Sequence, residues 1–428
     1  EETNNSANLN LTIPFRQWNG LASRFKVGGS YLAKDRTFRE RQFAFRYDGG
    51  SYPLNEYEGD VGAFVDAELG IDDERTTERR TRFGLYVTDL SQPSNNYDGD
   101  QEVAAGYVML DMPLMPSLRF VGGVRYETTE INVASLNEDI EPGELSEADL
   151  LPSLGLTWEA NEQTNLRLAY GRTLARPTFR ELAPFSGFEF VGDVILLGNP
   201  GLERTLIDSY DARWEWFVRP GEIYAVSAFY KGFENPIERA FDPRGTGGNG
   251  QVTFVNVPEG TVYGLEFEVR KRLDQLGDAF QNFQAGANLT LTQSEVDIEA
   301  EELDARRQTN PDAPDTRSFS GQSAFVFNID LGYNNPERGT SLNVFYNVFG
   351  ERLLEAGRGG TPDIFEQPRN DFDITFTQRL ISGFTLKASA KNLLNAKYEI
   401  TQEYLGTEYI LQDYDLGRSF SIGVSYGL

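Results

Sequence analysis

The last twelve residues, 417–428, alternate between apolar and small or polar side chains almost without a break. A β-strand points neighbouring side chains to opposite faces, so this segment has one apolar face and one small, polar face. A strand of about 11 residues is long enough to cross a bilayer at a tilt. Because an apolar strand at the end of a soluble chain invites aggregation, we expect it to be the closing strand of a membrane barrel.

The same alternation recurs along the chain. A soluble β-sandwich also has strands with one apolar face, so the period of two predicts strands but leaves the surroundings open. The clearest segments are 165–170, 210–218, 263–270, 285–292, 327–331, 371–376 and 384–391.

The links between these strands separate the two possibilities, because short and long links alternate along the chain. This asymmetry is typical of an outer-membrane barrel with short periplasmic turns and long extracellular loops, and a sandwich has no reason to adopt it. The short links are 17–20, 112–117, 160–164, 219–222, 334–340 and 381–383. The long polar stretches are 48–100, 135–150, 176–204, 236–250, 297–317, 351–369 and 393–413.

The pattern predicts about 15 strands. The first, 9–16, runs toward the short-turn side, and so does the last. Bacterial up-and-down barrels use an even number of strands, so an odd set whose ends run the same way cannot close alone. We therefore expect an all-β, antiparallel transmembrane barrel whose earlier strands are missing from this chain.

Composition excludes several classes of function. With neither His nor Cys, the chain cannot build a Ser-His-Asp or Cys-His catalytic site, a disulfide framework or a histidine-rich zinc site. A formal charge of −27 argues against nucleic acid as a partner, because phosphate binding needs a positive surface. No run approaches the 18 apolar residues of a membrane-spanning helix. We expect no enzyme activity and no cofactor.

Several segments resemble the C-terminal barrel of TonB-dependent outer-membrane receptors, and together they cover nearly the whole chain. They are 168–182, 198–203, 228–231, 235–238, 262–266, 392–398 and the closing strand. The resemblance implies a barrel of 22 strands around a plug domain that comes first in the chain. Residues 1–428 would then be strands 8 to 22, a partial barrel forming a single domain without the N-terminal plug.

The resemblance also implies a function in the outer membrane of a Gram-negative bacterium. External loops would bind a scarce solute, a plug would block the barrel, and a periplasmic TonB-type protein would supply energy for uptake. The expected partners are outer-membrane lipid, the missing plug, the TonB-type protein, the barrel-assembly machinery and an unknown small solute. A passive porin and a surface adhesin barrel remain as alternatives. The lack of His makes a haem receptor the less expected kind.

Two sets of residues are expected to serve the membrane. The C-terminus resembles the signal that the insertion machinery reads, on Ser421, Gly423, Tyr426 and Leu428. Trp214 and Trp216 precede a short turn, where we expect them in the periplasmic aromatic girdle. The alternatives are an ordinary amphipathic strand for the first set and soluble core packing for the second.

The candidate ligand-binding residues are on the long stretch 176–204. Pro177 opens a predicted short helical turn, and the aromatic residues that follow could stack on a ligand or seal the mouth. The alternative is a loop that packs on its own aromatic rings. The candidates are Arg180, Phe185, Phe188 and Phe190.

Two acidic segments, 95–100 and 297–304, have oxygen ligands suited to calcium. Neither has the spacing of a calcium loop, so we interpret both as solvated and expect no metal site. Charges on the polar faces of strands would contact the plug, as the resemblance implies, or simply wet the barrel interior. These are Arg167, Arg213, Glu215, Glu266, Glu268 and Arg270.

Overall fold

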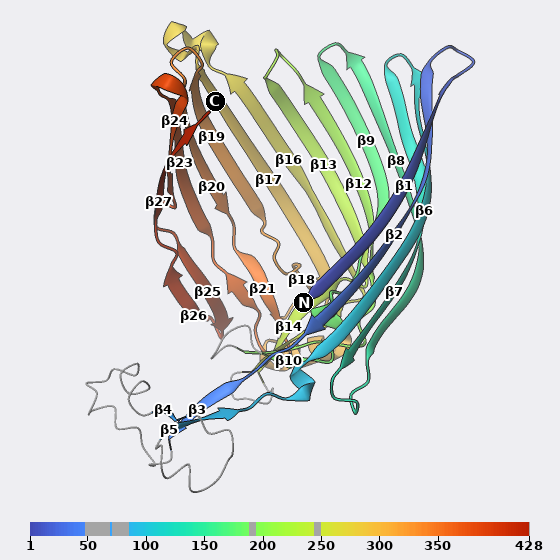
Figure 1. Cartoon of the computed structure of the whole chain (residues 1–428), viewed down its shortest axis with the longest axis vertical. Helices are drawn as coiled ribbons and strands as arrows, with labels where there is room; N and C mark the ends of the chain where they lie inside the picture. The colour runs from blue at the N-terminus through green and yellow to red at the C-terminus, as the bar shows by residue number, and fades with distance from the viewer. Residues whose placement is uncertain (48–68, 71–84, 188–193, 244–249, 428) are drawn as a thin grey trace.

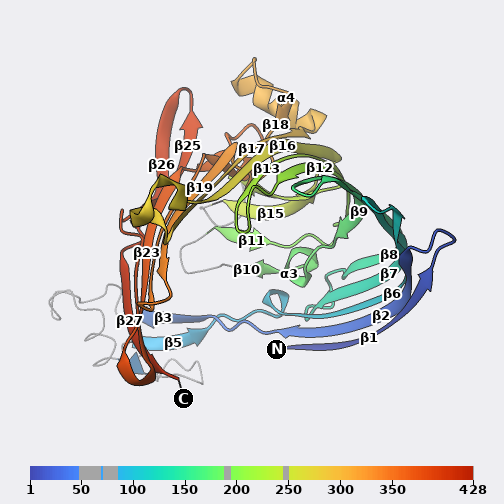
Figure 2. The same cartoon turned by 90° about the horizontal axis from the view of Figure 1, so that it is seen from above.

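The computed structural model describes residues 1–47, 69–70, 85–187, 194–243 and 250–427. Fifteen antiparallel strands follow one another in chain order and form one curved wall (Figures 1 and 2). The first eight are β1 (Glu2–Arg16), β2 (Ala22–Phe38), β6 (Tyr97–Met115), β7 (Leu118–Ser135), β8 (Gly143–Asn161), β9 (Thr164–Ala175), β12 (Thr205–Trp216) and β13 (Ile223–Glu234). The other seven are β16 (Glu259–Arg272), β17 (Phe283–Asp297), β19 (Phe325–Asn335), β20 (Thr340–Phe349), β23 (Arg369–Arg379), β24 (Phe384–Lys391) and β27 (Ser419–Tyr426). The strand count confirms the predicted fold class.

The alternating sequence gives the wall its two faces. On β12, Trp214 and Trp216 lie on the outer face, while Arg213 and Glu215, which alternate with them, point inward and bond to charged neighbours. The apolar side chains of the outer face remain exposed, with Leu9 on β1 at 79% and Ile422 on β27 at 78%. Such a face is stable only against a second apolar phase, as the predicted lipid provides.

The links alternate in length as predicted, with one addition. The turn 273–282 joins β16 to β17 at the short-turn end and holds two short 3-10 helices, η3 (Asp274–Leu276) and η4 (Asp278–Phe280). Sequence analysis did not include this polar, glycine-containing segment among the predicted short links. Two long stretches were predicted too long by several residues, because residues 97–100 belong to β6 and residues 143–150 belong to β8.

The long-loop end is itself structured. An eight-stranded second sheet joins segments of four loops across the mouth of the wall. Its strands are β10 (Ser186–Gly187), β11 (Ile195–Leu197), β14 (Ile237–Asp242), β15 (Gln251–Asn256), β21 (Arg352–Gly357), β22 (Ile364–Glu366), β25 (Lys397–Tyr404) and β26 (Thr407–Asp415). The polar composition of these stretches hid the strands from sequence analysis.

Smaller elements complete the long-loop end. β3 (Phe43–Tyr47), β4 (Leu69–Gly70) and β5 (Leu85–Asp89) form a third sheet, and β18 (Thr316–Arg317) pairs with the end of β17. Helix α3 (Phe179–Leu182) lies inside the wall, whereas α4 (Ala300–Thr309) projects from it (Figure 2). The other short helices of the described residues are η2 (Pro93–Asn95), before β6, and η5 (Ile381–Gly383), in the short turn between β23 and β24. Among the described residues, no helix combines the length and apolar character needed to cross a membrane.

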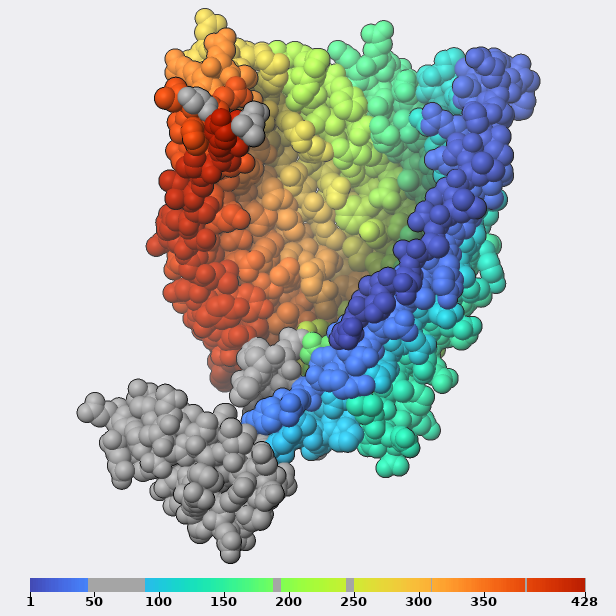
Figure 3. Space-filling model, in the orientation of Figure 1, coloured from blue at the N-terminus to red at the C-terminus, as the bar shows by residue number. Residues whose placement is uncertain are grey.

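The wall has two edges. Within the described residues, β1 pairs only with β2 and β27 only with β24, so each presents a row of backbone groups without a strand partner. Figure 3 looks between these edges into the hollow that the wall encloses. The first and last strands run in the same direction, as predicted, because an odd number of antiparallel strands separates them.

Candidate functional site

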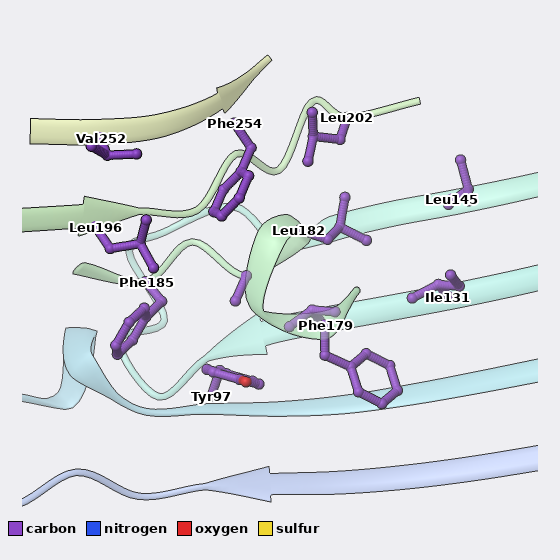
Figure 4. Packing of buried hydrophobic residues seen from close by; sticks show 12 residues of the cluster. Tyr97, Ile131, Leu145, Phe179, Leu182, Phe185, Leu196, Leu202, Val252 and Phe254 are labelled. Atoms are coloured by element: carbon purple, nitrogen blue, oxygen red, sulfur yellow. The ribbon is translucent and has the colours of Figure 1, made fainter. Parts of the chain in front are cut away.

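The largest apolar core of the described residues lies at the long-loop end, inside the wall. Strands β6, β7 and β8 are 19, 18 and 19 residues long, more than a membrane crossing needs. Their inner faces carry the described parts of the loop 176–204, including α3 (Figure 4). The core comprises Tyr97, Ile131, Val133, Leu145, Phe179, Leu182, Ala183, Phe185, Leu196, Leu202, Val252 and Phe254.

Helix α3 forms where the sequence predicted a short helical turn. Thr178 caps it, accepting a hydrogen bond from the backbone N–H of Glu181, whose carboxylate accepts one from the N–H of Thr178. This reciprocal capping box satisfies two backbone donors that a four-residue helix would otherwise leave open. Phe179 and Leu182, three residues apart, are both buried in the core.

Two glycines hold α3 in a narrow slot. A Cβ at Gly198 would meet the carbonyl oxygen of Ala183, and one at Gly143 would meet that of Leu182. Asn199 secures the contact: its backbone N–H donates to the carbonyl of Glu181 at 2.7 Å, and its side-chain amide donates to that of Phe254 at 2.8 Å. The Gly198–Asn199 pair therefore positions α3 against the second sheet.

Arginines anchor both ends of the loop 176–204 to the wall. At the start, Arg176 pairs with Glu127 of β7, and its Nε donates to the hydroxyl of Thr129 at 2.8 Å. At the end, Arg204 pairs with Asp149 of β8 at 2.8 Å. Glu127 and Asp149 face each other in register across β7 and β8 and are 6% and 5% exposed.

Ion pairs also connect the loops to one another. Arg317 pairs with the buried Glu238 of β14, which in addition accepts the backbone N–H of Ser320 at 3.0 Å. Arg239 pairs with Glu355 at 2.7 Å, beside a short parallel contact between β14 and β21. Because these partners come from separate links, the long-loop end forms one cross-linked layer.

The inward charges of the middle wall pair with one another. Glu215 accepts from Arg167 at 2.8 Å and from Arg213 at 2.9 Å, and Arg213 also reaches Glu268 at 2.7 Å. Arg270 lies 3.9 Å from Glu268. This network lines the hollow of the wall with polar groups. It neither requires nor excludes the plug contacts that the family resemblance implies.

The outer face carries aromatic rows at two levels. Tyr170, Tyr210, Tyr230 and Tyr263 lie in register on adjacent strands, with ring centroids of Tyr170 and Tyr210 5.0 Å apart. Six residues further along β12, the ring of Trp216 packs at a tilt against that of Tyr224, with centroids 5.5 Å apart. Trp214 and Trp216 therefore lie on the outer face near the short turns, where the predicted girdle places them. Their role at the interface stays a prediction.

The predicted ligand-binding residues have different surroundings. Phe185 is 3% exposed and packs edge-to-face on Phe38 of β2 at 5.3 Å, so its ring is buried against the wall. Arg180, on α3, is partly exposed. Phe188 and Phe190 lie outside the described residues. Ligand binding by these four residues stays a prediction.

The remaining candidates can be placed more briefly. Ser421, Gly423 and Tyr426 lie on β27, and Leu428 is outside the described residues. In the acidic segment 95–100, Asp98 pairs with Arg39 at 2.8 Å. The segment 297–304 spans the end of β17 and the start of α4, where Glu302 pairs with Arg306 at 3.1 Å. The described residues contain no group of three or more acidic side chains arranged to hold a metal ion.

Sequence analysis missed the anchoring residues Glu127, Asp149, Arg176 and Arg204. A usable signal was present, since an arginine stands at each end of a long polar stretch. Their acidic partners were beyond reach, because the pairs connect residues 49 and 55 positions apart.

Comparisons with known proteins agree with this architecture. The family model described as TonB dependent receptor-like, β-barrel matches residues 1–393. No curated protein matches.

Solved structures show the same fold. The ferric enterobactin receptor PfeA of Pseudomonas aeruginosa, as a Q482A mutant with enterobactin, is 16% identical with a TM-score of 0.58, covering 99% of this chain and 54% of that one. The siderophore receptor PiuA of Acinetobacter baumannii is 14% identical with a TM-score of 0.62, covering 99% and 56%. The ferric-catecholate import receptor Fiu of Escherichia coli K12 is 13% identical with a TM-score of 0.61, covering 99% and 54%. The chain therefore spans about half the length of these structures.

Proposed function

The chain belongs to the TonB-dependent receptor β-barrel family, and from this premise we propose that it serves energy-dependent uptake of a scarce extracellular solute. Proteins of this family are located in the outer membrane. The chain would contribute the barrel wall and the binding loops. A plug domain, a periplasmic TonB-type protein and the barrel-assembly machinery are its proposed partners.

One observation carries the proposal. The long loops of only one end interlock into a second sheet, and this layer lies over a hollow lined with paired charges. A receptor needs an ordered outer surface that binds a solute before it enters a polar passage. An open porin would leave its mouth unobstructed, so the layer favours the receptor.

The first solute class to test is ferric siderophores, because the three structural relatives are named as a ferric enterobactin receptor, a siderophore receptor and a ferric-catecholate import receptor. The inner arginines at the long-loop end, Arg176 and Arg204, add a chemical reason, because guanidinium groups suit anionic chelates. Both are already paired with carboxylates, so a bound anion would compete for them.

The test compares a deletion strain with the same strain carrying the full-length gene, under iron limitation. We expect radiolabelled iron to enter from a ferric siderophore only in the complemented strain. A protonophore, or loss of the TonB-type protein, should abolish this uptake. Uptake that survives these treatments would contradict the energy-coupled mechanism.

Liposomes distinguish the alternatives. Steady swelling in small sugars with the purified full-length protein would support a passive porin. Unchanged solute uptake after gene deletion, combined with loss of surface attachment, would support an adhesin barrel instead.

A further inference from the structure

The outer face of the wall has a hollow of about 380 Å³ near its short-turn end. It lies across β12, β13, β16 and β17, between two registered rows of apolar side chains. The row nearer the turns is Trp216, Tyr224, Val269 and Ala287, and the row above it is Trp214, Val226, Phe267 and Leu289. The small side chain of Ala287 beside these larger neighbours contributes to the depth of the hollow.

An unfilled hollow on this face is unfavourable, because its lining loses dispersion contacts. The face lies in the outer membrane, so hydrocarbon chains are the material that can fill the hollow. A second hollow of about 650 Å³ shares Trp214 and Val226 with the first. A lipid with two acyl chains can therefore place one chain on each side of Trp214.

A cation lies beside the hollow, at the end toward the turns. Lys271 follows Val269 by two residues on β16, so both point outward, and its Nζ lies 3.4 Å from the hydroxyl oxygen of Tyr224. Within the part of the chain that the structure describes, no carboxylate lies within ion-pair distance of Lys271.

Most of the neighbouring charges in the adjoining turns are paired with one another. In the adjoining turns, Arg219 pairs with Glu222 and Asp274, and Arg272 pairs with Asp274 at 3.3 Å. With Asp278 in the same turn, three carboxylates stand beside Arg219, Arg272 and Lys271, and among the described residues Lys271 is the one of these three cations without an ion pair. A lysine and aromatic side chains at the end of an apolar surface suit the depth at which lipid phosphates lie.

We propose that this hollow is a binding site for an anionic phospholipid. The acyl chains fill the hollows on either side of Trp214, and the phosphate accepts hydrogen bonds from Lys271 and Tyr224. The site faces the periplasmic leaflet and is separate from the solute path, which runs inside the wall.

Tryptophan fluorescence of the full-length protein in vesicles tests the site. The measurements use a background variant, W18F/W158F, to which the other substitutions are added. In this variant Trp214 and Trp216, which line the hollow, are the tryptophans that remain in this chain. Brominated phosphatidylglycerol should quench them about fivefold more effectively than brominated phosphatidylcholine, the factor expected of one lysine beside an anionic lipid.

Three substitutions separate the contributions of charge and shape. Lys271→Ala should remove the preference for phosphatidylglycerol, and Lys271→Arg should retain it. Ala287→Phe should fill the hollow and weaken quenching by both lipids. The control Arg338→Ala removes an exposed cation from another short turn and should leave the preference unchanged.

Equal quenching by the two lipids in W18F/W158F would overturn the proposal. A preference for phosphatidylglycerol that survives Lys271→Ala would also overturn it. Unchanged quenching in Ala287→Phe would overturn the placement of the acyl chains. All variants must show the strand signal of the parent protein by circular dichroism, and Lys271→Arg keeps the test valid if Lys271→Ala fails to fold.

Discussion

Arg176 stands where β9 leaves the wall, and its guanidinium is bonded to Glu127 and Thr129. Glu127 also accepts from Arg125 at 2.6 Å, so one carboxylate holds two guanidinium groups. Removing one partner of a buried ion pair typically costs about 3–5 kcal/mol when the other partner is left without compensation. At the scale of the residue, these contacts determine where the loop 176–204 lies.

Arg176→Ala should therefore loosen this loop. Because Arg125 still pairs with Glu127 in this variant, we expect the local opening free energy to fall by about 2–3 kcal/mol, less than for a carboxylate left without a partner. Hydrogen exchange at the backbone N–H groups of Leu182 and Ala183 measures it. The control Arg172→Ala removes an arginine that pairs with Asp208 on the outer face, and it should leave exchange in α3 unchanged. Unchanged exchange in Arg176→Ala would show that the apolar core alone holds the loop.

The short-turn cluster responds to pH. Hydrogen bonding from Arg219 lowers the pKa of Glu222 below its usual value and also lowers that of Asp274. A lowered pKa in the folded state means that each carboxylate stabilises the fold above its unfolded pKa, near 4. This stability is lost as the pH falls through the lower, folded-state pKa.

We expect Glu222→Gln to lower the unfolding temperature of the full-length protein at pH 7. The difference from the parent protein should shrink as the pH falls below about 4, where Glu222 becomes protonated and resembles glutamine. Thermal unfolding across pH 3–7 measures this difference. A difference that stays constant over the whole range would rule out a contribution from the charge of Glu222.

At the scale of the element, α3 is too short to be stable alone, since four residues form barely one helical turn. Its capping box satisfies its first donors, and its buried side chains fasten it to the wall. The glycines at positions 143 and 198 admit its backbone at a distance that no side chain would allow. The helix exists because the surrounding elements hold it in place.

Gly198→Ala should displace α3, because its Cβ would collide with the carbonyl of Ala183 rather than with a flexible side chain. We expect a cost of at least about 1–3 kcal/mol and faster proteolysis within 176–204. Gly201→Ala is the matched control: its Cβ would come no closer than 3.3 Å to a neighbouring atom, the Oδ1 of Asn199. Equal protease resistance in the two variants would contradict the claim that α3 needs a glycine at position 198.

At the scale of the whole molecule, the wall and the loop layer are held together differently. Continuous backbone ladders join the wall strands, whereas the layer depends on short strand pairings and ion pairs between loops. The layer is therefore the part that can rearrange without breaking the barrel.

Glu238→Gln tests whether the layer behaves as one unit. We expect exchange to increase in β14, β15 and β21 together, with the wall strands unchanged, because Glu238 holds both Arg317 and the backbone of Ser320. Hydrogen exchange with peptide resolution measures it. Lys397→Ala, which breaks an exposed pair with Asp413, is the control and should have little effect. An increase confined to β14 would mean that the loops move independently.

The wall was predictable because its signal is local. Alternation along a single strand specifies both of its faces, and the turn residues specify where each strand reverses. This was sufficient for the strand count, the direction of the first and last strands, and the placement of Trp214 and Trp216 on the outer face. The short helical turn at Phe179–Leu182 was predictable for the same reason. Its signals, Pro177 and the three-residue spacing of Phe179 and Leu182, lie within the turn and just before it.

The long-loop end required the tertiary structure. Glu127 meets Arg176, Glu238 meets Arg317, and β14 lies beside β21 only because the curved wall brings distant links to one mouth. Polar stretches give no period that reveals short strands paired across different loops. The sequence by itself determined an alternating, two-faced wall with all its long links at one end. The tertiary structure alone decided that these links form an ordered layer, because ion pairs and glycine contacts form between residues that only the fold makes neighbours.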